Sequence, residues 1–225
     1  MILTVAAVWR YPVKSMAGER LAMANVTEAG IEGDRLVRVC GPEGVRTSRR
    51  HHGLLGLRGT LDVNGQPLVN GHPWNSLAAL ADVKATAGED AWLEEAPAEE
   101  RFDIEPLLVV TDGAVAAFGR DVRRLRPNLV IAGVDGLGER TWPGGELHIG
   151  TVIVRLDSLR GRCPMTTVDP DTLERDPEVL RDIGRRFGGK LGLNAWVVRG
   201  GIIREGSDVT FLPSPAVAKS GVAVG

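Results

Sequence analysis

Cysteine is scarce in this sequence, because its 225 residues contain only Cys40 and Cys163. Two thiols are too few for a disulfide framework or for a zinc site built mainly from thiolates. They are also too few for an iron–sulfur cluster, which normally takes four cysteine ligands. We therefore expect no iron–sulfur cluster in this chain, so electrons for any redox reaction must arrive from a separate protein.

The sequence also lacks a strong excess of charge and a long apolar run. Its formal net charge is -2 and its pI is about 6.1, which gives no overall attraction to nucleic acid or to an anionic membrane. The N-terminus has no basic region followed by a long apolar stretch, and charged residues or prolines interrupt every later apolar run. We expect a cytoplasmic, reduced protein that binds neither nucleic acid nor a membrane.

The N-terminal part of the chain is expected to be rich in short strands. Branched and apolar side chains gather at residues 4–9, 35–40 and 57–63, and turn-forming residues separate these runs. The pair Asn64-Gly65 is typical of a tight hairpin.

Residues 88–100 are acidic and alanine-rich, which indicates a solvated connector between domains. A boundary there gives a β-rich N-terminal module at 1–95 and a second domain at 96–213. The small and polar residues 214–225 are expected to form a disordered tail.

Two amphipathic helices are expected in the second domain. Val115, Phe118, Val122 and Leu125 recur at helical spacing, with Thr111 or Asp112 as the N-cap. The second helix covers 177–187, with Asp176 as its cap and Gly188-Gly189 as its stop. Strands are expected at 147–156, 193–198 and 209–212. The predicted class is α+β, mostly β, with few helices.

Cys163 is the strongest candidate for chemistry. It lies in a loop after an expected strand, in the run Arg160-Gly161-Arg162-Cys163-Pro164. Neighbouring guanidinium groups favour the thiolate, the form that attacks electrophiles and binds soft metals. The alternative, equally open from the local sequence, is a buried cysteine that acts as a small apolar side chain. That alternative is preferred for Cys40, which ends an apolar strand.

A second candidate segment contains Arg123, Arg124, Arg126 and Asn128. Guanidinium groups suit a phosphate, and an asparagine amide can both donate to and accept from the edge of a heterocycle. For Arg123 and Arg124 it is equally open that they only complement the negative end of a helix dipole.

A third candidate segment follows the first strand and contains Lys14 and Ser15. Further cations in the same half are Arg35, Arg46, Arg49 and Arg50. If the strands bring these loops together, the cations form an anion pocket. Otherwise they are scattered over a solvated surface. The pair His51-His52 has no acidic or cysteine partner at a metal-ligand spacing, so we expect no metal there.

Together these segments resemble the MOSC family, the molybdenum cofactor sulfurase C-terminal domain with its N-terminal β-barrel module. The motifs, in order, are Tyr11-Pro12-Val13-Lys14-Ser15, Gly33-Asp34-Arg35, Leu125-Arg126-Pro127-Asn128-Leu129, and Arg162-Cys163 with Thr166-Thr167-Val168-Asp169-Pro170. The resemblance extends to about Leu212.

The resemblance implies a barrel-like MOSC domain packed closely against the β-rich N-terminal module. It also implies a molybdenum cofactor, a pyranopterin (molybdopterin) whose metal is bound by the thiolate of Cys163. The residues that would hold the phosphate and pterin are Lys14, Ser15, Arg35, Arg126, Asn128, Arg162 and Thr166.

The amidoxime-reducing members of the family, mitochondrial and bacterial, are the most similar two-module type. They reduce N-hydroxylated compounds, although Met16 and Gly161 depart from their pattern. The leading hypothesis is therefore an oxidoreductase for a small N-hydroxylated substrate, with an external electron-donor protein and a monomeric or homodimeric state. The alternatives are a sulfur or cofactor carrier that uses a Cys163 persulfide and a non-catalytic module that binds a phosphorylated ligand.

Overall fold

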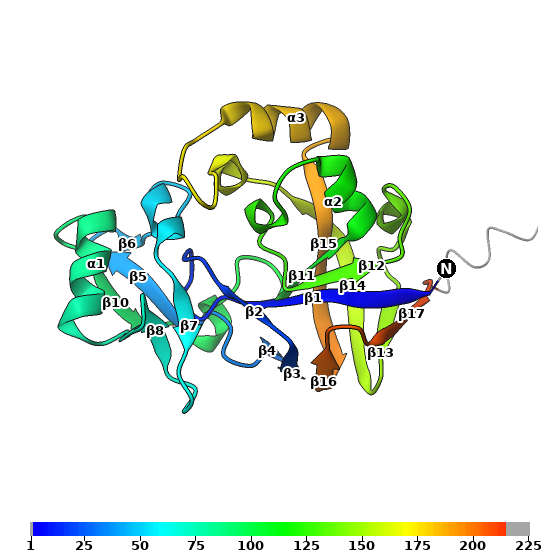
Figure 1. The fold of residues 1–225 in the computed structure, drawn as a ribbon, viewed down its shortest axis with the longest axis horizontal. Helices are drawn as coiled ribbons and strands as arrows, with labels where there is room; N and C mark the ends of the chain where they lie inside the picture. The colour runs from blue at the N-terminus through cyan, green and yellow to red at the C-terminus, as the bar shows by residue number, and fades with distance from the viewer. Residues whose placement is uncertain (1, 215–225) are drawn as a thin grey trace, which may run out of the picture.

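The chain forms a closed barrel of seven strands, seen in a computed structural model that describes residues 2–214. The strand order is β12, β11, β15, β14, β13, β17, β1, and pairing of β1 with β12 closes the barrel. Figure 1 shows β1 running beside the later strands. The bounds are β1 Leu3–Arg10, β11 Leu107–Thr111, β12 Leu129–Ala132, β13 Glu146–Ile149, β14 Val152–Gly161, β15 Lys190–Arg199 and β17 Asp208–Leu212.

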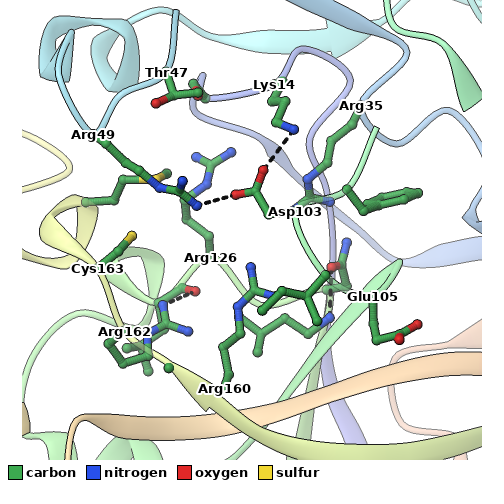
Figure 2. Close-up of a pocket in the computed structure, with 18 of the residues that line it drawn as sticks. Lys14, Arg35, Thr47, Arg49, Asp103, Glu105, Arg126, Arg160, Arg162 and Cys163 are labelled. Atoms are coloured by element: carbon green, nitrogen blue, oxygen red, sulfur yellow. Dashed lines mark hydrogen bonds and ion pairs between the residues drawn. The ribbon is translucent and has the colours of Figure 1, made fainter. Parts of the chain in front are cut away.

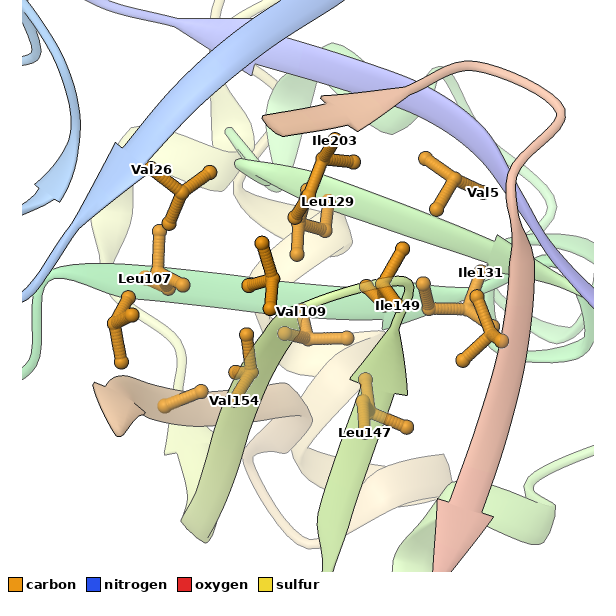
Figure 3. Packing of buried hydrophobic residues seen from close by; sticks show 14 of the residues in the cluster. Val5, Val26, Leu107, Val109, Leu129, Ile131, Leu147, Ile149, Val154 and Ile203 are labelled. Atoms are coloured by element: carbon orange, nitrogen blue, oxygen red, sulfur yellow. The ribbon is translucent and has the colours of Figure 1, made fainter. Parts of the chain in front are cut away.

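The barrel interior is filled with branched aliphatic side chains. In β11 and β12 the alternating residues Leu107, Val109, Leu129 and Ile131 are fully buried in one cluster, which also holds Val5 of β1. Figure 3 shows these side chains meeting between the strands. Burial of this kind contributes about 1.5–3 kcal/mol for each large apolar side chain. The barrel therefore gives a rigid base from which loops extend at the strand ends.

A second region, built from small sheets and one helix, lies beside the barrel (Figure 1). Its own core holds Val13, Val37, Val39, Leu54 and Val83. The strands outside the barrel are β2 Glu19–Leu21, β3 Met23–Thr27, β4 Gly30–Ile31, β5 Val37–Gly41, β6 Gly44–Val45, β7 Gly59–Leu61, β8 Pro67–Val69, β9 His72–Pro73, β10 Trp92–Glu95 and β16 Gly201–Arg204. β7 and β8 form the hairpin expected around Asn64-Gly65.

Three α-helices occur among the described residues: α1 Leu77–Ala87, α2 Asp112–Phe118 and α3 Pro177–Phe187. The prediction for α3 is confirmed, including the N-cap Asp176 and a left-handed Gly188 at the C-cap. A third apolar cluster packs α2 and α3 together through Phe118, Val179 and Ile183.

The prediction that the first helix continues to Leu125 is wrong. α2 ends at Phe118, because Gly119 adopts φ +68 and caps the helix. Residues Val122–Arg124 form a separate 3-10 turn, η3, which is capped by the side chain of Asp121.

Two features of the N-terminal half also correct the sequence-based expectations. The helix α1 was not expected, because its buried face consists of the small residues Ala79, Val83 and Ala87 while Leu77 is exposed. The segment expected to be a solvated connector contains β10, which pairs with β5. Residues 215–225 of the expected tail lie outside the described residues.

The mostly β, barrel-like class with few helices is confirmed. The domain division at residue 95 stays a prediction. Strand β1 precedes that boundary in the chain and pairs with β12 and β17, which follow it. The two parts are therefore closely joined by hydrogen bonds. Within residues 2–214, no helix has the length and apolar character that crossing a membrane requires.

Candidate functional site

Loops from both halves of the chain surround one cavity of about 440 Å³, which we call the first cavity. Its walls come from the loop after β1, the segment before β11, the loop between η3 and β12, and the end of β14. The lining residues are Lys14, Ser15, Arg35, Thr47, Arg49, Arg101, Phe102, Asp103, Ile104, Glu105, Leu108, Arg124, Leu125, Arg126, Asn128, Arg160, Gly161, Arg162, Cys163 and Met165.

The first cavity is strongly positive. Eight of its lining side chains are lysine or arginine, and only Asp103 and Glu105 are acidic. The chain as a whole carries a formal charge of -2, so the positive charge is a local property. A concave surface of one sign concentrates ions of the opposite sign. This cavity is therefore suited to a ligand with several negative charges.

Cys163 lies on this cavity with its side chain partly exposed, unlike Cys40, which is 3% exposed. Its loop is held by Thr166, whose backbone N–H and side-chain hydroxyl both donate to the Cys163 carbonyl, at 3.1 and 2.9 Å. The guanidinium groups of Arg126, Arg160 and Arg162 are the cations near Cys163. Figure 2 shows the sulfur directed toward the same space as these guanidinium groups. A concave wall with this many cations suits a ligand that carries negative charge.

Arg162 stands next to Cys163 and is partly buried in this wall. Its Nη2 donates to the Leu125 carbonyl at 2.7 Å, whereas its Nε is buried without a hydrogen-bond partner among residues 2–214. Burial lowers the pKa of Arg162 to about 10, so it stays charged at neutral pH. A buried donor atom without a partner is costly unless an anion compensates it.

Arg126 is also partly buried and is held by two contacts. Its Nη1 donates to the Met16 carbonyl at 2.6 Å, and its guanidinium lies 4.2 Å from the centre of the Tyr11 ring. Burial lowers its pKa to about 10 as well. The Tyr11 ring packs on Gly18, where a Cβ would lie 2.4 Å from Tyr11 Cδ1. Glycine at this position therefore allows the stack that orients Arg126.

The Asn128 amide is hydrogen-bonded within the fold. Its Nδ2 donates to Asp34 Oδ2 at 2.9 Å and to the Trp9 carbonyl at 3.2 Å, and its Oδ1 accepts from Leu108 N–H at 3.2 Å. The side chain thus links three parts of the fold. Asn128 also lines the first cavity, and its expected contact with the edge of a heterocycle stays a prediction.

Asp34 and Arg35 extend this buried network toward the cavity. Asp34 Oδ1 accepts from Tyr11 N–H at 2.6 Å, and Asp34 Oδ2 pairs with Arg35. Burial raises the pKa of Asp34 in spite of these partners. Arg35 lies over the rings of Tyr11 and Phe102, at 5.1 and 5.5 Å. Arg35 and Ser15 have positive φ values of 52 and 73, so both belong to tight turns.

Asp103 is a site residue that the sequence reasoning missed. Its Oδ1 lies 2.9 Å from Lys14 Nζ and its Oδ2 lies 2.5 Å from Arg49 Nη2 (Figure 2). Burial raises its pKa, but Lys14 and Arg49 outweigh burial, and the net pKa is lowered. It belongs to residues 101–105, which all line the cavity. The available signal was a carboxylate in a short segment directly before a barrel strand.

Some of the remaining arginines line the first cavity, and others form ion pairs elsewhere in the fold. Arg124 pairs with Asp169 at 2.7 Å and donates to the Thr167 carbonyl at 3.1 Å, so it braces the loop after Cys163. Arg46 pairs with Asp90 instead of lining the cavity, and Arg50 does not line it. Arg123 pairs with Asp121 and Asp171 on the surface. Thr166 is fully buried and not part of the cavity wall, so its placement indicates loop support and not ligand contact.

Comparison with protein families agrees with this arrangement. The family model of the MOSC domain matches residues 90–210, and that of the MOSC N-terminal beta barrel domain matches residues 2–96. The chain belongs to the MOSC family. The four motifs that suggested this family lie in or next to the first cavity of this MOSC chain.

Named relatives match only part of the MOSC chain. Mitochondrial amidoxime reducing component 2 of Macaca fascicularis and of Homo sapiens are each 40% identical over 76 residues, which is 31% of this chain. The chain spans 22% of the length of these two relatives. Molybdenum cofactor sulfurase of Bombyx mori is 33% identical over 88 residues, 39% of this chain and 10% of that protein.

One solved structure supports the fold. The YUAD protein from Bacillus subtilis has a TM-score of 0.53 and 12% identity, and the match covers 95% of this MOSC chain and 97% of that one. At this identity the likeness concerns the fold alone.

The residues of the MOSC chain fit a metal that is carried by an organic cofactor. Within the part of the chain that the structure describes, no three His, Cys, Asp or Glu side chains come together to hold a metal ion. A single soft ligand, Cys163, lies on a cavity rich in cations that suit a phosphate. The unpaired Nε of Arg162 is a further donor without a partner. One protein thiolate plus ligands from the cofactor would complete the coordination of such a metal.

Proposed function

We propose that this MOSC chain binds the molybdenum cofactor in the first cavity, with Cys163 as the protein ligand of the metal. The observation that carries the proposal is a partly exposed thiol on a cavity lined by eight cationic side chains. The relatives named amidoxime reducing component and molybdenum cofactor sulfurase support the same cofactor.

The roles of the side chains follow from their positions. Arg126, Arg160 and Arg162 are the cations that interact with Cys163, so they would neutralise a bound anion close to the metal ligand. Lys14, Ser15 and Arg35 line the opposite loops and would hold the phosphate or pterin. Thr166 and Arg124 fix the loop that presents the sulfur. In this arrangement the side chains of the protein would orient the bound cofactor.

The proposed activity is reduction of a small N-hydroxylated substrate, in which an N–OH group becomes N–H and water is released. The cofactor supplies the two-electron chemistry when bound. Two electrons and two protons enter in each turnover, and the electrons come from a separate donor protein. The positive cavity would disfavour cationic ligands, and the Cys163 loop would present one sulfur at the cavity wall.

The test is elemental analysis of the chain purified from a host that makes the cofactor. We expect about one molybdenum per chain, and reduction of benzamidoxime with reduced methyl viologen as the electron source. Cys163→Ser should lose both the metal and the activity. Cys40→Ser is the matched control, because Cys40 is buried away from the cavity, and it should keep both. Full metal content and activity in Cys163→Ser would contradict the proposal.

A second function, transfer of sulfur or of the cofactor, is favoured by the access of the Cys163 thiol and its cationic neighbours. Mass spectrometry of the freshly isolated chain separates the two. One added sulfur atom on Cys163, without stoichiometric molybdenum, supports the carrier. Stoichiometric molybdenum without turnover under any donor supports a non-catalytic binding module.

A further inference from the structure

A second cavity of about 560 Å³ lies behind the first. Arg124, Arg126 and Met165 line both cavities, so these three side chains form the wall between them. The proposed function makes no use of the second cavity. Its volume is within the range of about 300–1,000 Å³ that small-molecule sites occupy.

The second cavity has apolar side chains in its walls, and these come from both halves of the chain. Leu55 belongs to the N-terminal half, Val168 and Leu173 follow the Cys163 loop, and Trp9 comes from β1. Leu173 packs on the backbone of Gly56, where a Cβ would lie 2.7 Å from Leu173 Cδ1. The second cavity therefore lies where the two halves of the chain are in contact, a common position for ligand pockets.

The second cavity is lined by five arginines and only two carboxylates, so its lining carries a net positive charge. Both lining carboxylates already have a cation: Glu19 pairs with Arg10 at 2.8 Å, and Asp171 pairs with Arg123 at 2.7 Å. Two of the lining arginines, Arg20 and Arg124, are likewise neutralised, by Glu205 at 2.6 Å and Asp169 at 2.7 Å.

Two guanidinium groups of the second cavity have no such partner. Neither Arg58 nor Arg126 forms an ion pair with a carboxylate of residues 2–214. Arg58 is exposed at the cavity, and Arg126 is fixed in the wall by Met16 and Tyr11. The second cavity thus combines several apolar side chains with an unbalanced positive charge at an accessible arginine.

From these features we infer that the second cavity binds a small apolar anion, of the class of aryl carboxylates. The carboxylate pairs with Arg58, and the ring packs between Leu55 and Leu173 against Trp9. The eight cations of the first cavity suit a polyanion. Of the two unpaired guanidinium groups of the second cavity only that of Arg58 is exposed, and one accessible cation beside aliphatic side chains suits a monoanion with an apolar body. This inference does not depend on the proposed function.

The test uses 2-naphthoate as the probe and the purified, ¹⁵N-labelled chain in an NMR titration. Trp9 Nε1–H is the reporter, and its resonance is assigned among the five tryptophans with Trp9→Phe. We expect a saturable shift of this resonance with a dissociation constant below about 1 mM. Arg58→Ala should weaken binding about tenfold. Arg120→Ala, an exposed arginine that does not line the cavity, should leave it unchanged.

A second pair of variants tests the site without removing an arginine. The new side chains of Leu173→Glu and Leu173→Gln have nearly the same size. Leu173 has a φ of +61, and any backbone strain there affects both variants equally. The carboxylate of Leu173→Glu should weaken naphthoate binding several-fold more than the amide does. The inference is overturned if no saturable shift occurs up to about 5 mM, or if Arg162→Met abolishes binding while Arg58→Ala does not. The latter result would place the probe in the first cavity.

Discussion

Lys14 Nζ lies 2.9 Å from Asp103 Oδ1, so a lysine of the loop after β1 is neutralised by a carboxylate from the segment before β11. Arg49 pairs with the other oxygen of the same carboxylate. Asp103 therefore occupies a position that an anionic ligand of the first cavity would otherwise take. Its negative charge also reduces the attraction of this wall for such a ligand.

Asp103→Asn should raise the affinity of the first cavity for inorganic pyrophosphate about fivefold. The variant removes a competing charge while it keeps the shape of the side chain. Isothermal titration calorimetry measures the effect. Glu105→Gln is the matched control, because Glu105 lines the same cavity without an ion pair to a cation of residues 2–214, and its effect should be smaller. A fall in affinity would show instead that Asp103 positions Lys14 for binding.

The same pair predicts a pH dependence of stability. The pKa of Asp103 is lowered in the folded chain, whereas an unfolded aspartate has a pKa of about 3.9. Its stabilising contribution is thus complete above pH of about 5, and it disappears as the pH falls through the lowered folded value. The difference in free energy of unfolding between the original chain and Asp103→Asn should be constant from about pH 5 to 8 and shrink below about pH 4. Urea unfolding followed by tryptophan fluorescence measures it, and a difference that grows in acid would contradict the assignment.

Arg162→Met should weaken pyrophosphate binding about tenfold while it changes the free energy of unfolding by no more than about 1 kcal/mol. The partly buried guanidinium has a buried, unpaired Nε, so its loss removes a partly desolvated charge as well as the bond to Leu125. Calorimetry and urea unfolding provide the two measurements. Arg120→Met is the control for a general loss of positive charge. Binding that is unchanged in Arg162→Met would remove this residue from the site.

The two cysteines should differ in reactivity toward iodoacetamide. Cys163 lines the first cavity, whereas Cys40 is buried, and burial followed by the neighbouring Glu94 raises the pKa of Cys40 to about 11. Mass spectrometry of peptides should find Cys163 alkylated first in the native chain and both cysteines alkylated in urea. Pyrophosphate should slow the reaction of Cys163. Faster labelling of Cys40 would contradict the exposure described above.

Gly18→Ala should destabilise the chain by about 2 kcal/mol or more. A Cβ there would lie 2.3 Å from the Arg10 carbonyl oxygen and 2.4 Å from Tyr11 Cδ1, so the backbone and the ring must both move. Gly184→Ala in α3 is the control, because nothing lies within 4 Å of its Cβ position, and it should stabilise by about 0.5–1 kcal/mol. Urea unfolding measures both, and equal effects would show that the Tyr11 ring adapts.

Local signals in the sequence were sufficient for some elements and not for others. Asp176, Pro177 and Gly188 mark the ends of α3, since capping and glycine conformation act over a few residues. The helix expected through Leu125 shows the limit of periodicity, because a glycine in its path ended the helix at Phe118. The buried face of α1 consists of alanine and valine, and its apolar pattern is too weak to predict a helix.

The sequence by itself determined which residue types were available for the site: one thiol in a basic loop, a lysine and a serine after the first strand, and an arginine before β12. These depend on local composition and order. Only the tertiary structure decided which of them meet, because closure of the barrel brings β1 beside β12 and sets their loops around one cavity. The tertiary structure also decided that Asn128 hydrogen-bonds within the fold, that Asp103 pairs with Lys14, and that Arg46 pairs with Asp90. Local sequence could not predict these contacts, because each joins residues far apart in the chain.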